Sequence, residues 1–412
     1  MNQRFRFLFY LAIVSFFTLS FDIVCAQQKK ESSPAARKKA FELVWKTIND
    51  KYFDPGFGGV DWAAMREQYA PQIAAVKSDA ELHGLLRSMI QVLHVSHLSI
   101  VELRTLNTLS AVAVTTGLDL RDLDVGIVVT RVLEGSPAQR AGLRVGFVIK
   151  RIDGAAATKA RDAENKLSGV TGSHRVGFLD ERDALRETVL ENHLPGSDDL
   201  AKLSLTREAT WYALLESKRL ANGIGYIHFT NFIGPIQKKL ATALDSMKDA
   251  PGLIIDLRSN SGGDDSVGLA LAGMLLEKET QLAISRTHKG DNYYYKATPQ
   301  KNPFTGPVVM LLDETSGSES EQIAAGLQEV GRAVVIGKKT AGSDMDAEAI
   351  NLPTGAALFY PYGQPRTPKG VIIEGYGVKP DIEVNLTRAE LLKGNDSQLE
   401  AAIEYIQKKQ RR

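Results

Sequence analysis

The sequence has a single cysteine, Cys25, which lies close to the N-terminus. It comes at the end of an apolar run, "FLFYLAIVSFFTLSF", that is preceded by Arg4 and Arg6. Basic residues, an apolar run and a small-residue end at "VCA" are typical of a secretory signal peptide, and they predict cleavage after Ala26. Cleavage there would remove the only thiol, so the mature chain would have neither disulfides nor cysteine chemistry.

Two other interpretations of this N-terminal segment are weaker. An uncleaved membrane anchor would need a longer apolar stretch, and Asp22 interrupts this one. A lipid attached to Cys25 would require a smaller residue before it than Val24. We therefore expect a signal peptide over residues 1–26, a polar linker over 27–39, and export to a bacterial periplasm or to the cell exterior.

An excess of charge of one sign is also missing. The chain has 50 lysines and arginines against 49 aspartates and glutamates, a formal net charge of +1. Such a balance provides no long-range field for nucleic acid or for an anionic membrane, so neither is expected as a partner. The 412 residues, which contain no internal repeat, exceed one ordinary hydrophobic core and predict two or three domains.

Residues 40–108 are expected to form a small helical subdomain. Phe41, Val44 and Ile48 recur at helical spacing, and "AELHGLLRSMIQVL" shows the same period. The segment "DPGFGGVDW" between them is rich in turn residues and predicts a loop.

Residues 109–210 change to short β-like runs, "GLDL", "GIVVTRVL" and "GFVIKRIDG", separated by "EGSPAQRAGL". These segments resemble a PDZ domain, with a polar insert, "SGVTGSHRVGFLDERD", in its second half. The resemblance implies that one loop offers backbone N–H groups to the terminal carboxylate of a peptide, which would add a strand to the sheet edge. That loop consists of Gly117, Leu118, Asp119 and Leu120. The alternative is a small β-rich spacer domain.

Residues 211–412 alternate between apolar strand-like runs and helical patterns. Strands are expected at "GIGYIHF", "GLIIDLR", "PVVMLLD" and "AVVIG", with helices between them and a terminal helix at "DSQLEAAIEYIQKK". This alternation predicts a layered α/β core.

One stretch of that core, "ETSGSESEQIAAG", allows two interpretations. Ser318 and Glu321 fit the Ser-x-x-Glu capping box, in which two side chains satisfy free N–H groups at a helix start. A serine at the turn between a buried strand and a helix N-terminus also lies where developing negative charge is stabilised. Serine is a weak nucleophile until a base removes its proton, so the choice depends on finding a base.

A histidine at the end of the helical subdomain is the candidate base. His97 lies in "VLHVSHLSIV", where the helical period gives way to an extended run. His94 and His97 could be a metal-binding pair, but no third ligand follows at a useful spacing. A lone histidine here would ordinarily be a packed or capping residue.

Together, these segments resemble the tail-specific, or C-terminal processing, serine proteases. The resemblance rests on motifs in a fixed order, which include "ELVWKTINDKYFD", "LIIDLRSNSGGDDS", "SGSESEQIAAGL", "GRAVVIGKKTAG" and "EGYGVKPDIEV". It implies an α/β fold, a crotonase-like layered protease core with an inserted PDZ domain and an N-terminal helical subdomain. Matching the serine-rich motif implies Ser318 as the nucleophile.

The sequence departs from many members of that family in its base. Where they have a lysine in a Gly-Lys-Gly stretch, this chain has Ser343 in "TAGSDMD", and Lys338 and Lys339 belong to the preceding strand end. A second branch, similar to the catalytic core of tricorn proteases, uses a Ser-His pair and a glutamate instead. The resemblance to that branch implies His97 as general base, and Ser96 as the link between His97 and Glu374.

The same resemblance implies an oxyanion hole in the glycine pair of "DLRSNSGGDD". Paired glycines let the backbone approach a substrate carbonyl closely. One donor is assigned to the N–H of Gly262, with Gly263 as the alternative, and the other to the N–H of Glu319.

The sequence therefore predicts an exported serine endopeptidase that acts on polypeptides, which it could engage by their C-termini, without a metal or an organic cofactor. The rival hypothesis is a protein of the same shape that binds peptides or apolar ligands without cutting them. A further hypothesis, a preference for cationic substrate residues, comes from acids near the predicted site. These are Asp264, Asp265, Glu319, Glu321, Asp344 and Asp346.

Overall fold

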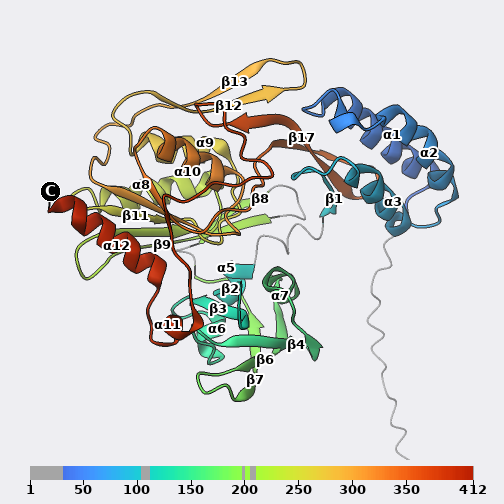
Figure 1. Cartoon of the computed structure of the whole chain (residues 1–412). Coiled ribbons are helices and arrows are strands. Elements are labelled where there is room, and N and C mark those ends of the chain that lie inside the picture. Colours follow the sequence, from blue (N-terminus) through green and yellow to red (C-terminus); the bar gives the residue numbers. More distant parts are fainter. Residues whose placement is uncertain (1–30, 104–111, 197–199, 205–209, 412) are drawn as a thin grey trace, which may run out of the picture.

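The structure, a computed structural model, describes residues 31–103, 112–196, 200–204 and 210–411 (Figure 1). Three helices form the N-terminal part, α1 (Pro34–Lys51), α2 (Trp62–Ala75) and α3 (Asp79–Gln91). Each begins at a Ser or Asp whose side chain accepts a backbone N–H of the first turn. Helix α1 starts inside the segment that the sequence predicts as a linker, and the predicted signal peptide lies outside the described residues.

The PDZ-like part has a six-stranded sheet in the order β2-β3-β4-β6-β7, with β5 paired to β4. Three short helices, α5, α6 and α7, accompany it, and Figure 1 shows it below the rest of the molecule. The strands are β2 (Leu118–Leu123), β3 (Gly126–Val132), β4 (Val148–Ile152), β5 (Ala155–Ala156), β6 (Gly172–Leu179) and β7 (Leu185–Asn192). The helices are α5 (Val112–Thr116), α6 (Pro137–Arg140) and α7 (Ala160–Leu167).

One expectation about this part is wrong. The polar stretch predicted as an insert contains strand β6, which pairs with β7 along its length and with β4 over Val176–Leu179. Val176 and Phe178 are buried, whereas the first half of the strand, Gly172–Arg175, is polar and less buried, so the stretch looks polar in the sequence.

The central sheet has seven strands in the order β18-β15-β14-β11-β10-β9-β8. The strands from β10 to β18 run parallel, whereas β9 and β8 are antiparallel additions at one edge. Strand β8 thus belongs to this sheet although it falls within 109–210. The strands are β8 (Leu200–Ser204), β9 (Thr210–Arg219), β10 (Gly225–Phe229), β11 (Leu253–Asp256), β14 (Val308–Leu312), β15 (Val334–Gly337) and β18 (Ile382–Glu383).

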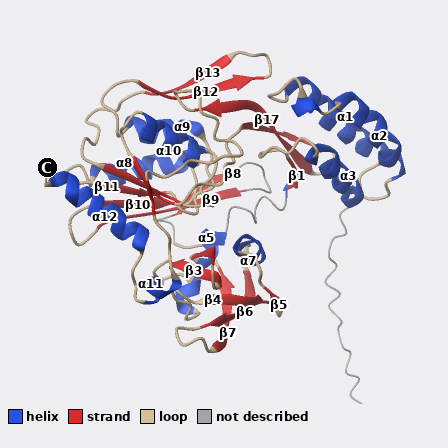
Figure 2. Ribbon diagram, in the orientation of Figure 1, coloured by secondary structure: helices blue, strands red, loops and turns tan. Residues whose placement is uncertain are grey.

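Helices cover both faces of the central sheet, which makes it a layered α/β core (Figure 2). One face packs on α8 (Gln237–Asp245), α9 (Asp265–Gly273) and α10 (Glu319–Glu329) in the largest apolar cluster. The other face packs on α12 (Ser397–Gln410), whose Ala402 and Ile406 are buried against it. The short α11 (Arg388–Leu392) contacts the PDZ-like sheet through Leu391. The mixed α/β fold predicted from the sequence is confirmed.

A second, antiparallel sheet joins the core to the N-terminal helices. Its order is β1-β17-β12-β13, with β16 paired to β17. Because β1 follows directly after the N-terminal helices, its pairing with β17 fixes the segment around His97 against the core. The strands are β1 (Ser99–Glu102), β12 (Thr280–Thr287), β13 (Asn292–Ala297), β16 (Asp346–Asn351) and β17 (Ala356–Arg366).

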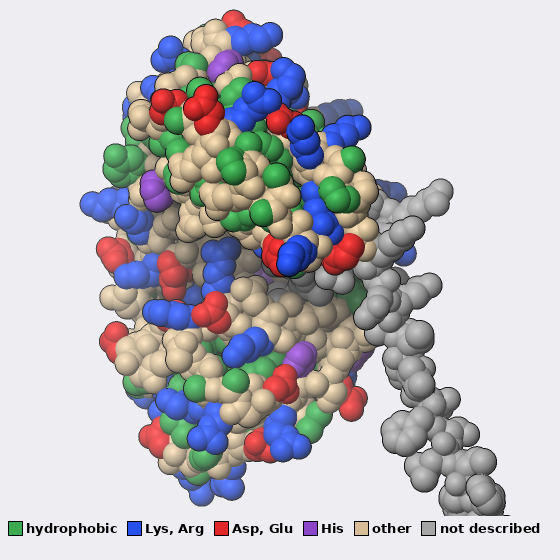
Figure 3. Space-filling view, turned by 90° about the vertical axis from the view of Figure 1, so that its right-hand side faces the viewer, with side chains coloured by type: hydrophobic (Ala, Val, Ile, Leu, Met, Phe, Trp, Pro, Cys, Tyr) green, Lys and Arg blue, Asp and Glu red, His purple; other side chains and the backbone are tan. Residues whose placement is uncertain are grey.

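The surface carries acidic and basic side chains interspersed, as Figure 3 shows for one face. This mixture agrees with the formal net charge of +1. Within the described ranges, no helix combines the length and the apolar character that crossing a bilayer requires.

Candidate active site

Ser318 is the last residue before helix α10, at the turn that follows buried strand β14. Its backbone has φ 53° and ψ −125°, a conformation that residues other than glycine rarely adopt and that costs about 1–3 kcal/mol. The hydroxyls of its neighbours are used elsewhere, because Ser316 donates to Leu257 O (2.8 Å) and Ser320 donates to Asn260 O (2.9 Å). Of the three serines, Ser318 alone has its hydroxyl next to a histidine.

The capping interaction predicted for this turn is formed in part. Glu321 accepts the backbone N–H of Ser318 at 3.2 Å, as a capping box requires. The Ser318 side chain makes no capping hydrogen bond, and the Glu321 N–H donates to the Ser318 backbone carbonyl at 2.7 Å instead. Glu321 therefore holds the turn while the Ser318 hydroxyl stays available.

A chain of short polar contacts leads from Ser318 to the partly buried carboxylate of Glu374. Ser318 Oγ lies 3.2 Å from His97 Nε2, and His97 Nδ1 lies 2.7 Å from Ser96 Oγ. Ser96 donates its hydroxyl to Glu374 Oε2 (2.7 Å) and its backbone N–H to Glu374 Oε1 (2.8 Å). Four residues predicted from widely separated parts of the sequence thus lie within one hydrogen-bonded chain.

The chemistry of these groups determines which atom donates and which accepts in each hydrogen bond. A carboxylate only accepts, so the single hydroxyl proton of Ser96 points to Glu374 and the Ser96 oxygen accepts from His97 Nδ1–H. Nε2 of His97 then carries a lone pair toward Ser318 Oγ. This tautomer can take a proton from the Ser318 hydroxyl.

Burial lowers the pKa of His97, and the carboxylate of Glu374 offsets part of that effect. The imidazole is consequently neutral near pH 7, the state in which it can act as a base.

Ser343 stands where the resemblance to many tail-specific proteases implies a lysine, and its carbonyl accepts the Ser318 N–H at 2.8 Å. Lys338 points elsewhere, because its ammonium group contacts Glu383 Oε1 (2.7 Å) and Asn385 Oδ1 (2.6 Å). Lys339 is exposed. Neither lysine is hydrogen-bonded to Ser318.

The glycine pair packs directly against the Ser318 turn. A Cβ at Gly262, which has φ +94°, would lie 2.6 Å from Ser318 Cβ, so no other residue fits. The Gly262 N–H already donates to Asn260 Oδ1 (2.9 Å). In the described part of the chain, the N–H groups of Gly263 and Glu319 have no hydrogen-bond acceptor. The two free donors are thus those of Gly263 and Glu319, rather than that of Gly262.

A cavity lies in front of Ser318 and His97, between helix α10 and the second sheet. Carboxylates and aromatic rings from several elements share its lining. Sequence analysis had not identified the aromatic residues, which no local pattern brings together. They are Trp211, Tyr295, Phe359 and Tyr362.

The predicted carboxylate loop of the PDZ-like part leads into β2, the edge strand of its sheet. The Leu118 N–H donates to Thr116 Oγ1 (3.2 Å) and the Leu120 N–H donates to Glu164 Oε1 (3.2 Å). Gly117 leaves no room for a side chain, since a Cβ there would lie 2.2 Å from Ser136 Cβ, and Asp119 is buried near Arg131. A peptide that adds a strand here must displace the acceptors on Leu118 and Leu120.

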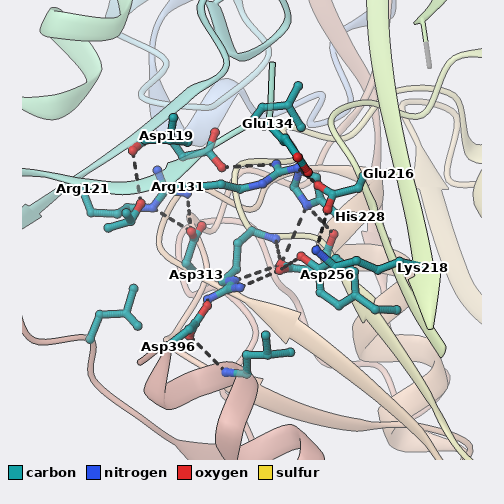
Figure 4. A pocket seen from close by; sticks show the side chains of 17 residues that line it. Asp119, Arg121, Arg131, Glu134, Glu216, Lys218, His228, Asp256, Asp313 and Asp396 are labelled. Atoms are coloured by element: carbon teal, nitrogen blue, oxygen red, sulfur yellow. Dashed lines mark hydrogen bonds and ion pairs between the residues drawn. The ribbon is translucent and has the colours of Figure 1, made fainter. Parts of the chain in front are cut away.

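A second cavity, strongly charged, lies between the PDZ-like part and the central sheet (Figure 4). In it, Arg121 of β2 donates to Asp313, which directly follows strand β14 and precedes the Ser318 turn. Arg131 of β3 pairs with Glu216 of β9. Sequence analysis had missed these pairs, although a charged residue inside an apolar strand, as in "LDLRDL", is a recognisable signal.

Comparison with known families identifies three segments of the chain. Residues 223–384 match peptidase family S41, residues 33–91 match the tricorn protease C1 domain, and residues 109–172 match the PDZ domain. These matches confirm the resemblance to tail-specific proteases that the sequence motifs indicated.

Curated relatives and a solved structure agree with this result. The C-terminal processing peptidase of Tetradesmus obliquus chloroplasts is 26% identical over 84% of this chain and 76% of its own length. Putative tricorn protease homolog 2 of Streptomyces coelicolor is 28% identical over 90% of this chain but 32% of its own length. The photosystem II D1 C-terminal processing protease shares the fold, with a TM-score of 0.60 at 22% identity over 88% of this chain and 98% of that one. Residues 223–384 therefore match peptidase family S41, and the chain is a serine peptidase similar to carboxyl-terminal processing proteases.

Proposed function

We propose that the chain is an exported endopeptidase in which Ser318 is the nucleophile and His97 the general base. The observation that carries the proposal is the unbroken hydrogen-bonded series from Ser318 through His97 and Ser96 to Glu374. Such a series activates a serine, orients the imidazole in one tautomer and stabilises the imidazolium as it forms. The basic and apolar residues at the N-terminus support export.

In the proposed reaction, Ser318 Oγ attacks the scissile carbonyl while its proton passes to His97 Nε2. The tetrahedral intermediate collapses when His97 returns that proton to the leaving amine, which breaks the peptide bond and leaves an acyl-enzyme. Water then attacks the ester, gives one proton to His97 and releases the acid and Ser318. Glu374 acts on His97 through the Ser96 hydroxyl.

The oxyanion is proposed to accept hydrogen bonds from the N–H groups of Gly263 and Glu319, which have no other acceptor among the described residues. The start of helix α10 adds a favourable dipole at the same place. Gly262 contributes by allowing the two turns to pack closely.

The substrates are proposed to be polypeptides cut near their C-termini. This rests on the names of the relatives, which are carboxyl-terminal processing proteases, and on the PDZ match. We further propose a division of the chain into an N-terminal helical subdomain, a PDZ domain whose sheet ends at Asn192, and a protease core that begins with β8.

Labelling with a fluorophosphonate tests the proposed nucleophile. Folded protein is expected to take up one label, which peptide mapping places on Ser318 rather than on Ser316 or Ser320, because only the Ser318 hydroxyl lies beside a base. Heat-denatured protein serves as the control and should not react. A label on another residue would refute the assignment. Folded protein that neither reacts nor cleaves an unfolded polypeptide would favour a binding protein.

The pH dependence of kcat/KM should follow His97. Because its pKa is lowered by burial, His97 remains unprotonated below its ordinary value of about 6.5. Activity falls once His97 is protonated and can no longer accept the serine proton, so the acid limb should have its midpoint below pH 6.5. The measurement is kcat/KM from pH 4.5 to 8.5 with a peptide that carries no titratable side chain. A midpoint at pH 7 or above would contradict the role of His97.

A further inference from the structure

The cavity in front of Ser318 is bordered by carboxylates from separate segments of the chain. Asp265 lies in the first turn of α9, and Glu319 opens α10 directly after Ser318. Asp344 and Asp346 come from the segment that leads into β16. All four line the cavity that also contains Ser318 and His97.

Two of these carboxylates, Asp344 and Asp346, have a buried Oδ2 atom without a hydrogen-bond partner in the described part of the chain. Asp344 is 2% exposed, and its Oδ2 has no hydrogen-bond partner within the described ranges. Burial, followed by the negative charges of Glu321 and Asp346, raises the pKa of Asp344 well above its ordinary range. A buried oxygen without a donor is costly, which suggests that a donor arrives from outside the chain.

Glu319 is also a buried carboxyl group whose pKa is shifted. It is 4% exposed, and burial together with the charge of Asp265 raises its pKa well above the ordinary range. Burial and Asp264 also raise the pKa of Asp265. Among the described residues, no lysine or arginine lines the cavity, so the carboxyl groups repel one another. A bound cation would relieve this repulsion.

The other walls suit a long cationic side chain rather than a bare metal ion. Trp211, Tyr295, Phe359 and Tyr362 present aromatic rings to the same cavity. Such rings pack against the aliphatic stem of lysine or arginine and attract its charged end. In the described part of the chain, no group of three or more His, Cys, Asp or Glu residues is arranged to hold a metal.

We propose that this cavity binds the side chain of a lysine or arginine at the substrate residue whose carbonyl Ser318 attacks. The inference rests on the proposed function of Ser318 and deepens it by naming the preferred substrate residue. The location of Glu319 supports this choice of substrate residue. Glu319 directly follows the nucleophile, and its N–H is proposed to bind the oxyanion that forms from the attacked carbonyl. The side chain next to the attacked carbonyl must therefore lie within the same cavity.

The test uses a set of N-acetylated, internally quenched peptides with a free C-terminus that differ only at this residue. Lysine, arginine, norleucine and glutamate are compared, and acetylation ensures that the cation is a side chain rather than a peptide N-terminus. We expect kcat/KM for lysine and arginine to exceed that for norleucine by about tenfold or more at pH 8, the size expected for a hydrogen bond to a charged group. The ratio of lysine to norleucine should be lower at pH 5.5 than at pH 8, because a raised pKa makes these carboxyl groups take up protons at higher pH than an ordinary carboxyl group.

The variant Asp344→Asn should lower this ratio by about tenfold, because the amide keeps the shape but removes the charge. Asp265→Asn is a second variant, at a less buried carboxylate, and should also lower the ratio. The matched control is Asp245→Asn on the surface of α8, which should leave it unchanged.

Different results would refute the pocket assignment and the proposed function. If wild type labels with a fluorophosphonate but cleaves norleucine peptides as well as lysine peptides, or prefers lysine on the leaving-group side, the pocket assignment is wrong and the proposed function stands. Wild type that neither labels nor cleaves any peptide would overturn the proposed function itself. A lysine preference that Asp265→Asn and pH both leave unchanged would also refute the pocket.

Discussion

Replacement of His97 by alanine is expected to lower kcat for a polypeptide substrate by about 10⁴- to 10⁶-fold, with KM changed little. The imidazole lies 3.2 Å from Ser318 Oγ, and among the described residues no other base is hydrogen-bonded to that oxygen. Without it, the serine must lose its proton to water, and the leaving amine has no acid. The large loss follows because the members of such a series act as a unit.

The experiment compares single-turnover cleavage of an unfolded protein by wild type, His97→Ala and a control, His193→Ala. His193 is an exposed histidine of the PDZ-like part that contacts Arg140, so its loss should leave kcat within a factor of about two. Circular dichroism verifies that each variant is folded. An active His97→Ala enzyme, inactivated instead by Lys338→Ala or Lys339→Ala, would show that a lysine is the base.

The sequence allowed the regular core to be predicted because its signals are local. The apolar run "GLIIDLR" became strand β11, and "SEQIAAGLQEV" became helix α10, which packs its apolar face on the sheet. Such patterns depend on one face of an element being buried, so they can be read without knowing the partner.

The second sheet could not be predicted in this way. Strand β17 contains Pro361 and Pro365, residues that normally argue against a strand. It is nevertheless the strand on which β1, β12 and β16 assemble. Its identity depends on these neighbours and not on a pattern of its own.

The proposed catalytic residues were found by resemblance and not by local reasoning. Ser96 and Glu374 are 278 positions apart, yet they share two hydrogen bonds. Local sequence reasoning favoured a capping role for Ser318. The resemblance implied that the Gly262 N–H is an oxyanion donor. Only the structure shows that this N–H already donates to the Asn260 side chain.

The buried ion pairs between the PDZ-like part and the central sheet were the most important feature that the sequence did not predict. The substitution of one of these charged residues is expected to have a large effect on stability. Arg121→Met should lower the free energy of unfolding of the protein by about 3–5 kcal/mol, the usual result of leaving one member of a buried ion pair alone. Arg121 and Asp313 are both 4% exposed, and Arg121 Nε donates to Asp313 Oδ2 at 2.7 Å (Figure 4). The same arginine also donates to Ser259.

Activity should fall along with stability, because Asp313 holds the turn that precedes Ser318. Its Oδ1 accepts the N–H groups of Thr315 (3.0 Å) and Ser316 (3.1 Å). Burial alone would raise the pKa of Asp313, but Arg121 and the hydrogen bonds from Thr315 outweigh it and keep that pKa lowered. Without Arg121, the unpaired carboxylate would tend to take up a proton or draw in water, and either change would alter the turn.

The pH dependence separates this mechanism from a simple loss of packing. In wild type, the lowered pKa of Asp313 means that its contribution to stability is present at neutral pH and is lost as the pH falls through that pKa. In Arg121→Met, burial without the cation raises the pKa, so the ionised carboxylate destabilises the variant more as the pH rises. The stability difference between wild type and variant should therefore be larger at pH 8 than at pH 5.

Urea unfolding at pH 5 and pH 8 measures the free energies of unfolding of wild type and variant. Two further variants test whether the effect comes from the buried charge. Asp313→Asn combined with Arg121→Met should recover part of the lost stability, because the amide keeps an acceptor for the turn and removes the unpaired charge. Arg66→Met, which breaks an exposed pair with Glu42, should cost no more than about 1 kcal/mol. If Arg121→Met is destabilised equally at both pH values and the double variant recovers nothing, Arg121 contributes by packing and not by charge. A normal kcat in that variant would mean that the ion pair joins the domains without supporting the Ser318 turn.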